Sequence, residues 1–176
     1  MHLFFVGMKH CGKSTFAPLI AEDAGMTCAD SDDLLLMMPD ITSIRSFYRT
    51  HGQEAFMMRE LETVEKYLDE HPDGVLSLGG GAADNIPLMN LLKKKGKIVY
   101  LKRNEKLLLE KIMKNGLPPF LDPADPQGSF HVIYERRSRV YEEYADMIID
   151  LEVYEDIGRT KERIEREIKE FLNGGK

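Results

Sequence analysis

The strongest constraint on the fold lies in residues 4–15, which read FFVGMKHCGKST. An apolar run rich in aromatic and branched residues, at 2–6, predicts a buried strand. A Gly-x-x-x-x-Gly-Lys-Ser pattern follows from Gly7, and apolar residues then recur at helical spacing to about Asp23. Such a pattern between a strand and a helix is typical of a loop that wraps a phosphate group.

The chemistry of this phosphate loop explains its spacing. Its two glycines let the backbone N–H groups turn inward, and the helix starting at Lys13 adds the positive end of its dipole. The lysine reaches the outer phosphates of a nucleotide, and the Ser14 hydroxyl suits Mg²⁺. The sequence therefore predicts a site for ATP and Mg²⁺. The expected nucleotide-binding residues of the loop are Gly7, His10, Cys11, Gly12, Lys13, Ser14 and Thr15.

Predicted strands and helices alternate along the chain, which indicates an α/β fold with a five-stranded parallel sheet and helices on both faces. No internal repeat or linker divides residues 1–176, so we expect a single domain. The strands are expected at 2–6, 26–30, 74–78, 97–101 and 147–151. The helices are expected at 13–23, 53–69, 87–94, 104–113 (capped by Asn104), 129–145 and 158–172, with a further helical region before 53 that Pro39 interrupts.

The segment 114–128 has a different character, with four prolines and two glycines. It cannot continue a helix. Irregular segments of this length inside a compact domain are usually functional or disordered. We therefore expect this segment to serve the site.

Composition excludes several classes of function. The net charge of −6 disfavours a general nucleic-acid or anionic-membrane surface. There is no leader and no apolar run near eighteen residues, so we expect neither secretion nor membrane spanning. The two cysteines, Cys11 and Cys28, form no CxxC pair, which fits a reducing cytoplasm. We expect a cytoplasmic monomer that binds a small-molecule substrate.

Carboxylates and glycines follow the next two predicted strands. DSDD (30–33) places Asp30 and Asp32 two residues apart, so one could face a metal and the other an acceptor hydroxyl. GGG (79–81) would let a ligand touch the backbone. The carboxyl ends of parallel strands gather ligands at one edge. Simpler alternatives are a helix N-cap for DSDD and a tight turn for GGG.

The stretches GMKHCGKST, ADSDDLL, HGQEAF and DGVLSLGGGA, at these separations, resemble the shikimate kinase family over nearly the whole chain. The glycine triplet after VLSL is the most specific part. The resemblance implies a nucleoside-monophosphate-kinase-like fold, with a substrate-binding helical region at about 31–70 and a mobile lid at about 114–128. It also implies transfer of the ATP γ-phosphate to a hydroxyl of shikimate, giving shikimate 3-phosphate.

The resemblance further implies a role for individual residues. Lys13 and Ser14 would serve the phosphates and Mg²⁺, with Asp30 near the metal. Asp32 would bind the acceptor's hydroxyls and accept the proton. The remaining expected contacts are Gly79, Gly80 and Gly81 around the acceptor, Arg137 at its carboxylate, and Lys111 where the family often carries an arginine over the adenine.

Two signature arginines of the family are absent. The position after the phenylalanine of GQEAF is Met57, and the lid position before a Pro-Leu pair is Pro118. Arg59 is turned about 200° from Met57 along a helix, toward another face. The spacing of Met57 with Leu61, Val64 and Leu68 suits an apolar stripe. Cations that could compensate are Arg136, Arg139, Lys111 and Lys114, although each also suits a solvated helix face.

Three functions remain open on the sequence. The first is a shikimate kinase. The second is a related kinase whose polyol acceptor lacks a carboxylate, which the missing arginines would permit. The third is a non-catalytic nucleotide-binding protein, against which the joint presence of Lys13, Ser14, Asp30 and Asp32 argues.

Overall fold

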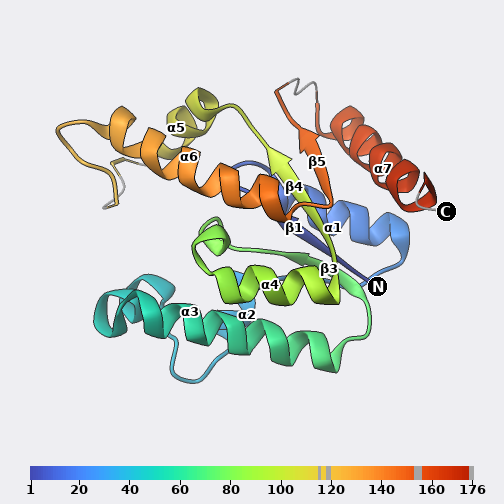
Figure 1. Ribbon diagram of the computed structural model, residues 1–176, viewed down its shortest axis with the longest axis horizontal. Coiled ribbons are helices and arrows are strands. Elements are labelled where there is room, and N and C mark those ends of the chain that lie inside the picture. Colours follow the sequence, from blue (N-terminus) through green and yellow to red (C-terminus); the bar gives the residue numbers. More distant parts are fainter. Residues whose placement is uncertain (115, 118–119, 153–155, 175–176) are drawn as a thin grey trace.

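A computed structural model of the chain describes residues 1–114, 116–117, 120–152 and 156–174. Five strands form one parallel sheet, as predicted, and four of them are labelled in Figure 1. Their order in the sheet is β2-β3-β1-β4-β5. The central strand β1 pairs with both β3 and β4. The strands are β1 (His2–Val6), β2 (Cys28–Asp30), β3 (Gly74–Ser77), β4 (Gly96–Lys102) and β5 (Met147–Asp150).

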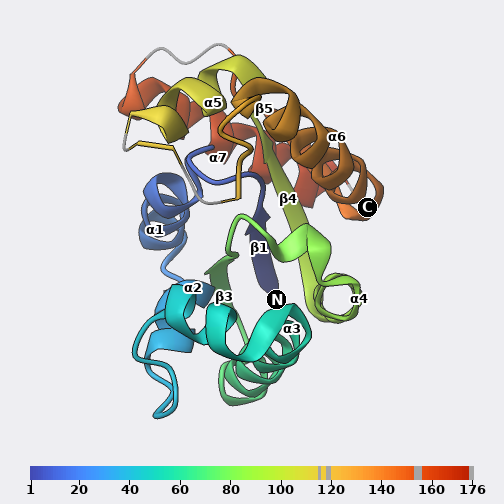
Figure 2. The same ribbon diagram turned by 90° about the vertical axis from the view of Figure 1, so that its left-hand side faces the viewer.

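Helices cover both faces of this sheet (Figures 1 and 2). On one face α1 packs against β2 and β3, and α7 packs against α1 and β5. On the other face α4 and α6 contact β4, while α3 packs beside α4 and α2. The helices are α1 (Lys13–Ala24), α2 (Ser31–Leu36), α3 (Ile44–Glu70), η1 (Ala82–Asp84), α4 (Ile86–Lys95), α5 (Glu105–Met113), α6 (Pro126–Tyr144) and α7 (Ile157–Gly174).

The central strands form the core because both of their faces are covered. Every residue of β1 is buried, and Phe4, Phe5 and Val6 have no exposed surface. Such strands read as continuous apolar runs, which is why this one is visible in the sequence. Each buried side chain of this size contributes roughly 1.5–3 kcal/mol relative to an exposed one.

Two helix boundaries differ from the sequence prediction. α3 begins at Ile44 and continues to Glu70, because a helical segment before residue 53 joins the expected long helix across a kink at Gly52 (φ 83°, ψ 177°). α6 begins at Pro126, within the segment expected to be irregular. Proline suits the first turn of a helix, and the Asp125 side chain caps this one by accepting from the backbone N–H of Gly128. Pro118 lies outside the described residues.

The part of the chain that carries α2 and the start of α3 has its own small core. Leu35, Ile41 and Phe47 bury against one another, separately from the main core around the sheet. Met38 and Phe56 pack around this small core. The region is therefore attached to the sheet but stabilised in part by its own contacts.

Within the described residues, no helix has the length and apolar character needed to cross a bilayer.

Candidate active site

The phosphate loop joins β1 to α1 at the carboxyl edge of the sheet. Its backbone requires glycine at Gly7, where φ is 144° and a Cβ atom would lie 2.7 Å from the carbonyl oxygen of Leu101. Gly12 precedes α1 with φ 118°, and His10 also has a positive φ of 66°. The loop therefore has the turned backbone that phosphate binding requires.

Lys13 begins α1 and turns its side chain back into the loop. Its side chain is nearly buried, and Nζ donates to the carbonyl oxygens of Gly7 at 2.8 Å and Met8 at 3.0 Å. The ammonium group therefore braces the loop from inside. This contact was not foreseen from the sequence, which predicted only a ligand-facing charge.

A cavity of about 500 Å³ lies over the loop, and we call it the nucleotide cavity. Most of the residues expected at the nucleotide line it, whereas Gly7 and Cys11 do not. Cys11 is fully buried, which explains its absence from the wall. The lining includes His10, Gly12, Lys13, Ser14, Thr15, Asp30 and Lys111, together with Lys9, Phe16, Asp32, Leu78, Gly79, Gly80 and Arg103.

Positive charge is concentrated around this cavity. Burial lowers the pKa of His10, and Lys9, Lys111 and Lys13 lower it further. Burial also lowers the pKa of Lys111, as does neighbouring Arg103. Such a cluster favours anionic ligands.

Asp30 links β2 to the phosphate loop. Its Oδ1 accepts from the backbone N–H of Asp32 at 2.9 Å, so the N-cap reading of DSDD is confirmed for this residue. Its Oδ2 accepts from the Ser14 hydroxyl at 3.2 Å. A hydroxyl and a carboxylate side by side are oxygen donors of the kind that Mg²⁺ takes, usually beside waters and substrate phosphates. Among the described residues no group of three or more His, Cys, Asp or Glu could hold a metal ion, so this pair fits Mg²⁺ only with nucleotide oxygens completing the shell.

A larger cavity of about 1280 Å³ adjoins the first, and we call it the acceptor cavity. Lys9 and Asp32 line both cavities, so they mark the junction. Of the glycine triplet, Gly81 lines the acceptor cavity, while Gly79 and Gly80 line the nucleotide cavity. The acceptor cavity is lined by α3, the loop after β3, α6 and Phe120 in the segment before α6. The residues on these elements include Met57, Glu60, Ala83, Asp84, Arg136 and Arg137.

The glycine triplet lets two backbone segments approach closely. A Cβ atom at Gly80 would lie 2.6 Å from the backbone nitrogen of Lys9. A Cβ atom at Gly79 would lie 2.8 Å from Oδ1 of Asp32. A side chain at Gly80 would push the loop after β3 away from the phosphate loop, and one at Gly79 would displace Asp32, so the triplet does more than make a tight turn.

Two carboxyl groups beside the junction hold protons more tightly than usual. Burial within the cleft raises the pKa of Asp32, and Asp30 raises it further, while Lys13 and Lys9 oppose the change. Burial raises the pKa of Glu60 to about 7, against a hydrogen bond from Asn85 Nδ2 that favours its charged form. Perturbed carboxyl groups in a cleft are typical of functional sites.

Arg137 lies on the α6 side of the acceptor cavity and already contacts a carboxylate. Its Nη2 donates to Oδ2 of Asp84 at 2.8 Å, and its Nη1 donates to the carbonyl oxygen of Gly80 at 3.2 Å. Arg136 donates to the other oxygen of Asp84 at 3.0 Å. Asp84 is therefore held by two arginines. A ligand carboxylate that binds Arg137 would have to share the positive charge of this arginine with Asp84.

Met57 lies on the wall of the acceptor cavity, half-buried, whereas Leu61, Val64 and Leu68 pack in or against the main core. The apolar stripe expected from the sequence therefore leaves out its first member. Arg59 points elsewhere, as its position along the helix predicted, and forms ion pairs with Asp40 and Glu62.

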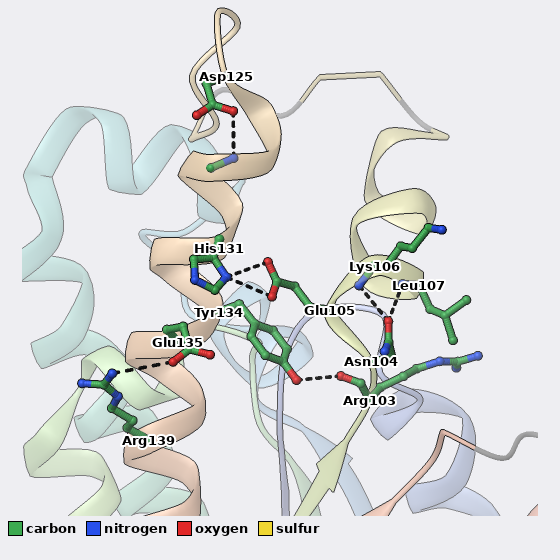
Figure 3. Close-up of polar contacts among 11 residues, drawn as sticks. Arg103, Asn104, Glu105, Lys106, Leu107, Asp125, His131, Tyr134, Glu135 and Arg139 are labelled. Atoms are coloured by element: carbon green, nitrogen blue, oxygen red, sulfur yellow. Dashed lines mark hydrogen bonds and ion pairs between the residues drawn. The ribbon is translucent and has the colours of Figure 1, made fainter.

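Side chains of α5 and α6 contact each other and the end of β4, beside Arg103 (Figure 3), which lines the nucleotide cavity. The Tyr134 hydroxyl donates to the carbonyl oxygen of Arg103 at 3.0 Å, and Asn104 caps α5 as predicted. His131 on α6 contacts Glu105 on α5, which raises the pKa of His131. These contacts fix Arg103 where β4 ends, beside the loop.

Several residues that line the cavities were not predicted from the sequence, and Arg103, Glu60 and Asp84 are three of the charged ones. Arg103 follows β4 at the ligand-gathering edge of the sheet, and this position was the available signal. No sequence signal pointed to Glu60 or Asp84, because the burial of Glu60 and the pairing of Asp84 arise from contacts with residues distant in sequence.

Comparison with known proteins shows which family this chain resembles. A family model described as shikimate kinase matches residues 9–172. A shikimate kinase from Francisella tularensis subsp. holarctica is 29% identical over 171 residues, covering 97% of this chain and 94% of that protein. One from Francisella philomiragia subsp. philomiragia is 28% identical over 171 residues with the same coverage of both chains.

Solved structures share the fold. A shikimate kinase from Acinetobacter baumannii, solved in complex with shikimate, superposes with a TM-score of 0.82 at 24% identity, covering 99% of this chain and 94% of that one. A shikimate kinase from Aquifex aeolicus superposes with a TM-score of 0.79 at 22% identity. The match covers 99% of this chain and 100% of that one.

Proposed function

The chain belongs to the shikimate kinase family, and from this premise we propose that it transfers the γ-phosphate of ATP to a hydroxyl of shikimate, forming shikimate 3-phosphate and ADP. The enzyme is a kinase, and ATP is its co-substrate.

The position of Asp32 is the observation that best supports this reaction. Asp32 lines both cavities, so its carboxylate lies where a phosphate donor in one and a hydroxyl acceptor in the other would meet. A carboxylate near the incoming hydroxyl can orient it and accept its proton. In the proposed step the hydroxyl oxygen attacks the γ-phosphorus, the bond to the β-phosphate oxygen breaks, and the hydroxyl proton passes to Asp32.

The nucleotide side would work mainly by positioning charge. We assign the outer phosphates to Lys13 and the backbone of the phosphate loop, and Mg²⁺ to Ser14 and Asp30. The contact between the Ser14 hydroxyl and Asp30 supports this pairing. Mg²⁺, when bound, neutralises charge on the phosphate oxygens during transfer. Lys111 and Arg103 on the far wall suit the remainder of the nucleotide.

The acceptor side would hold the ring of shikimate. Gly81 and Arg137 line the acceptor cavity, and the lack of a side chain at Gly79 leaves room for the carboxylate of Asp32. The relative from Acinetobacter baumannii was solved with shikimate, which supports this substrate. We also propose a cytoplasmic monomer that binds no nucleic acid.

The experiment that tests the function is phosphate transfer from ATP, measured on purified protein with shikimate, quinate, gluconate and simple polyols. We expect transfer confined to shikimate. Transfer to another acceptor but not to shikimate would contradict the substrate, and no transfer to any of them would contradict the enzyme.

A further inference from the structure

Two arginines at the start of α3 face the acceptor cavity. Arg45 and Arg49 line it together with Ile44 and Tyr48, and both arginines are exposed. They are four residues apart on a helix, so their side chains lie on the same face. They belong to the segment before the kink at Gly52, which lies within the substrate-binding helical region expected at about 31–70, although neither arginine was predicted as a site residue.

Neither guanidinium group has a partner among the residues that the structure describes. No hydrogen bond or ion pair joins Arg45 or Arg49 to any of them, in contrast to the other arginines of this region. Arg136 and Arg137 are held by Asp84, and Arg59 is held by Asp40. The two unpaired cations therefore keep their full capacity for an anionic ligand.

The other walls of the acceptor cavity offer few cations that could pair with a carboxylate of the acceptor. A carboxylate out of bulk water needs a paired cation, because an unpaired one has a large desolvation cost. Arg137 is already bound to a carboxylate of the protein, and the wall at Met57 is a thioether. Lys9 lies at the junction with the nucleotide cavity, where it is suited to phosphate.

The segment that carries the two arginines is held in place by packing. Phe47, on the opposite side of this short helical segment, is buried in the small core with Leu35 and Ile41. The Tyr48 ring packs against Phe56 across the kink, with ring centroids 5.6 Å apart. In both views α3 lies apart from α6 (Figures 1 and 2), so these arginines and Arg137 approach the cavity from different elements.

We propose that Arg45 and Arg49 form the carboxylate subsite of the acceptor cavity, replacing the arginine that the family carries at the position of Met57. The inference rests on the proposed function and adds the residues that select an acidic acceptor. Arginine suits this task because its planar group binds a carboxylate through two hydrogen bonds. The acceptor ring would then lie between this subsite and Asp32.

The test compares KM and kcat for shikimate in wild type, Arg45→Ala, Arg49→Ala and the double variant. Each single change should raise KM roughly tenfold, and the double change more, because a charge-assisted contact is lost. The kcat should stay within about twofold, since the contact is equal in ground and transition states. Arg49→Lys should recover part of the loss. Arg139→Ala is the matched control, because Arg139 is exposed, does not line the acceptor cavity and pairs with Glu135 (Figure 3), so its loss should leave KM unchanged.

A second acceptor separates charge recognition from a change in cavity shape. Shikimate methyl ester has the same hydroxyls but no carboxylate, so the variants should match wild type in KM for the ester. Melting temperatures of all variants show whether the small core remains folded. Unchanged KM for shikimate in the double variant, or an equal loss for shikimate and ester, would overturn the inference while leaving the proposed function standing. A wild-type protein inactive toward shikimate would overturn the proposed function and the subsite with it.

Discussion

The nucleotide cavity and the acceptor cavity meet at Asp32 but are built in different ways. The first is made largely from one continuous stretch, where the loop after β1 supplies both its backbone and its lysine. The second is assembled from α3, the loop after β3 and α6, which are distant in sequence. A continuous motif keeps its geometry through chain connectivity, whereas a dispersed site can exchange one residue for another on a different element. The departure from the family at Met57 accordingly falls on the acceptor side.

The largest effect is expected for Lys13→Ala. Its ammonium group would serve the phosphates and also bonds to the carbonyl oxygens of Gly7 and Met8. We expect kcat to fall by on the order of a thousandfold or more. Circular dichroism should show the fold retained, because the lost bonds lie within one loop. Near-normal turnover would show that phosphate transfer does not depend on the lysine of the phosphate loop.

A smaller loss is expected at the junction of the cavities. Asp32→Asn keeps the shape but removes the proton acceptor, so kcat should fall by roughly a hundredfold. Asp30→Asn should act through the Mg²⁺ pair with Ser14, and excess Mg²⁺ should partly restore its activity. Titrating Mg²⁺ against both variants separates the roles, and an identical response would contradict the division proposed for them.

Met57→Arg tests whether the acceptor wall accepts the family's arginine. The new cation would lie one helical turn from Glu60, so it should lower the pKa of that buried carboxyl group and pair with acceptor carboxylate. We expect KM for shikimate to fall by roughly tenfold, with Met57→Leu as the uncharged control. The gain should be greatest in the variant lacking Arg45 and Arg49. A lower melting temperature without a lower KM would mean that the cavity was shaped for another acceptor.

The smallest effect is expected at the exposed pair of His131 and Glu105 (Figure 3). The pKa of His131 is raised in the folded protein, so its contribution to the free energy of unfolding is present at pH values below the ordinary histidine pKa near 6.5. This contribution is lost as pH rises through the raised value. His131→Gln should therefore melt slightly below wild type at pH 5.5 and together with it at pH 9. A difference that does not change with pH would assign the effect to packing.

Much of the fold was predictable because its signals are local. The buried run of β1, the cap at Asn104 and the alternation of strands with helices are all visible within short windows. A helical region before residue 53 was predicted, but not that it begins at Ile44 and joins the long helix, because the backbone at Gly52 leaves the helical conformation between the two segments.

The candidate site divides in the same way. Ser14 and Asp30 were predicted to lie together, since both follow strands at one edge of the sheet, and they do. The buried position of Cys11, the pairing of Asp84 with two arginines and the cavity-facing side of Arg45 depend on distant elements. Spacing along the chain carries no information about such contacts.

The small core of Leu35, Ile41 and Phe47 has a consequence for how such a protein can diverge. Because these residues bury one another rather than the strands, substitutions on the outer face of the same segment alter the acceptor wall without disturbing the sheet. Selection can therefore change the acceptor while the use of ATP is retained. For the same reason this segment is a suitable place to engineer new acceptor specificity. A replacement segment would include the small core that stabilises it.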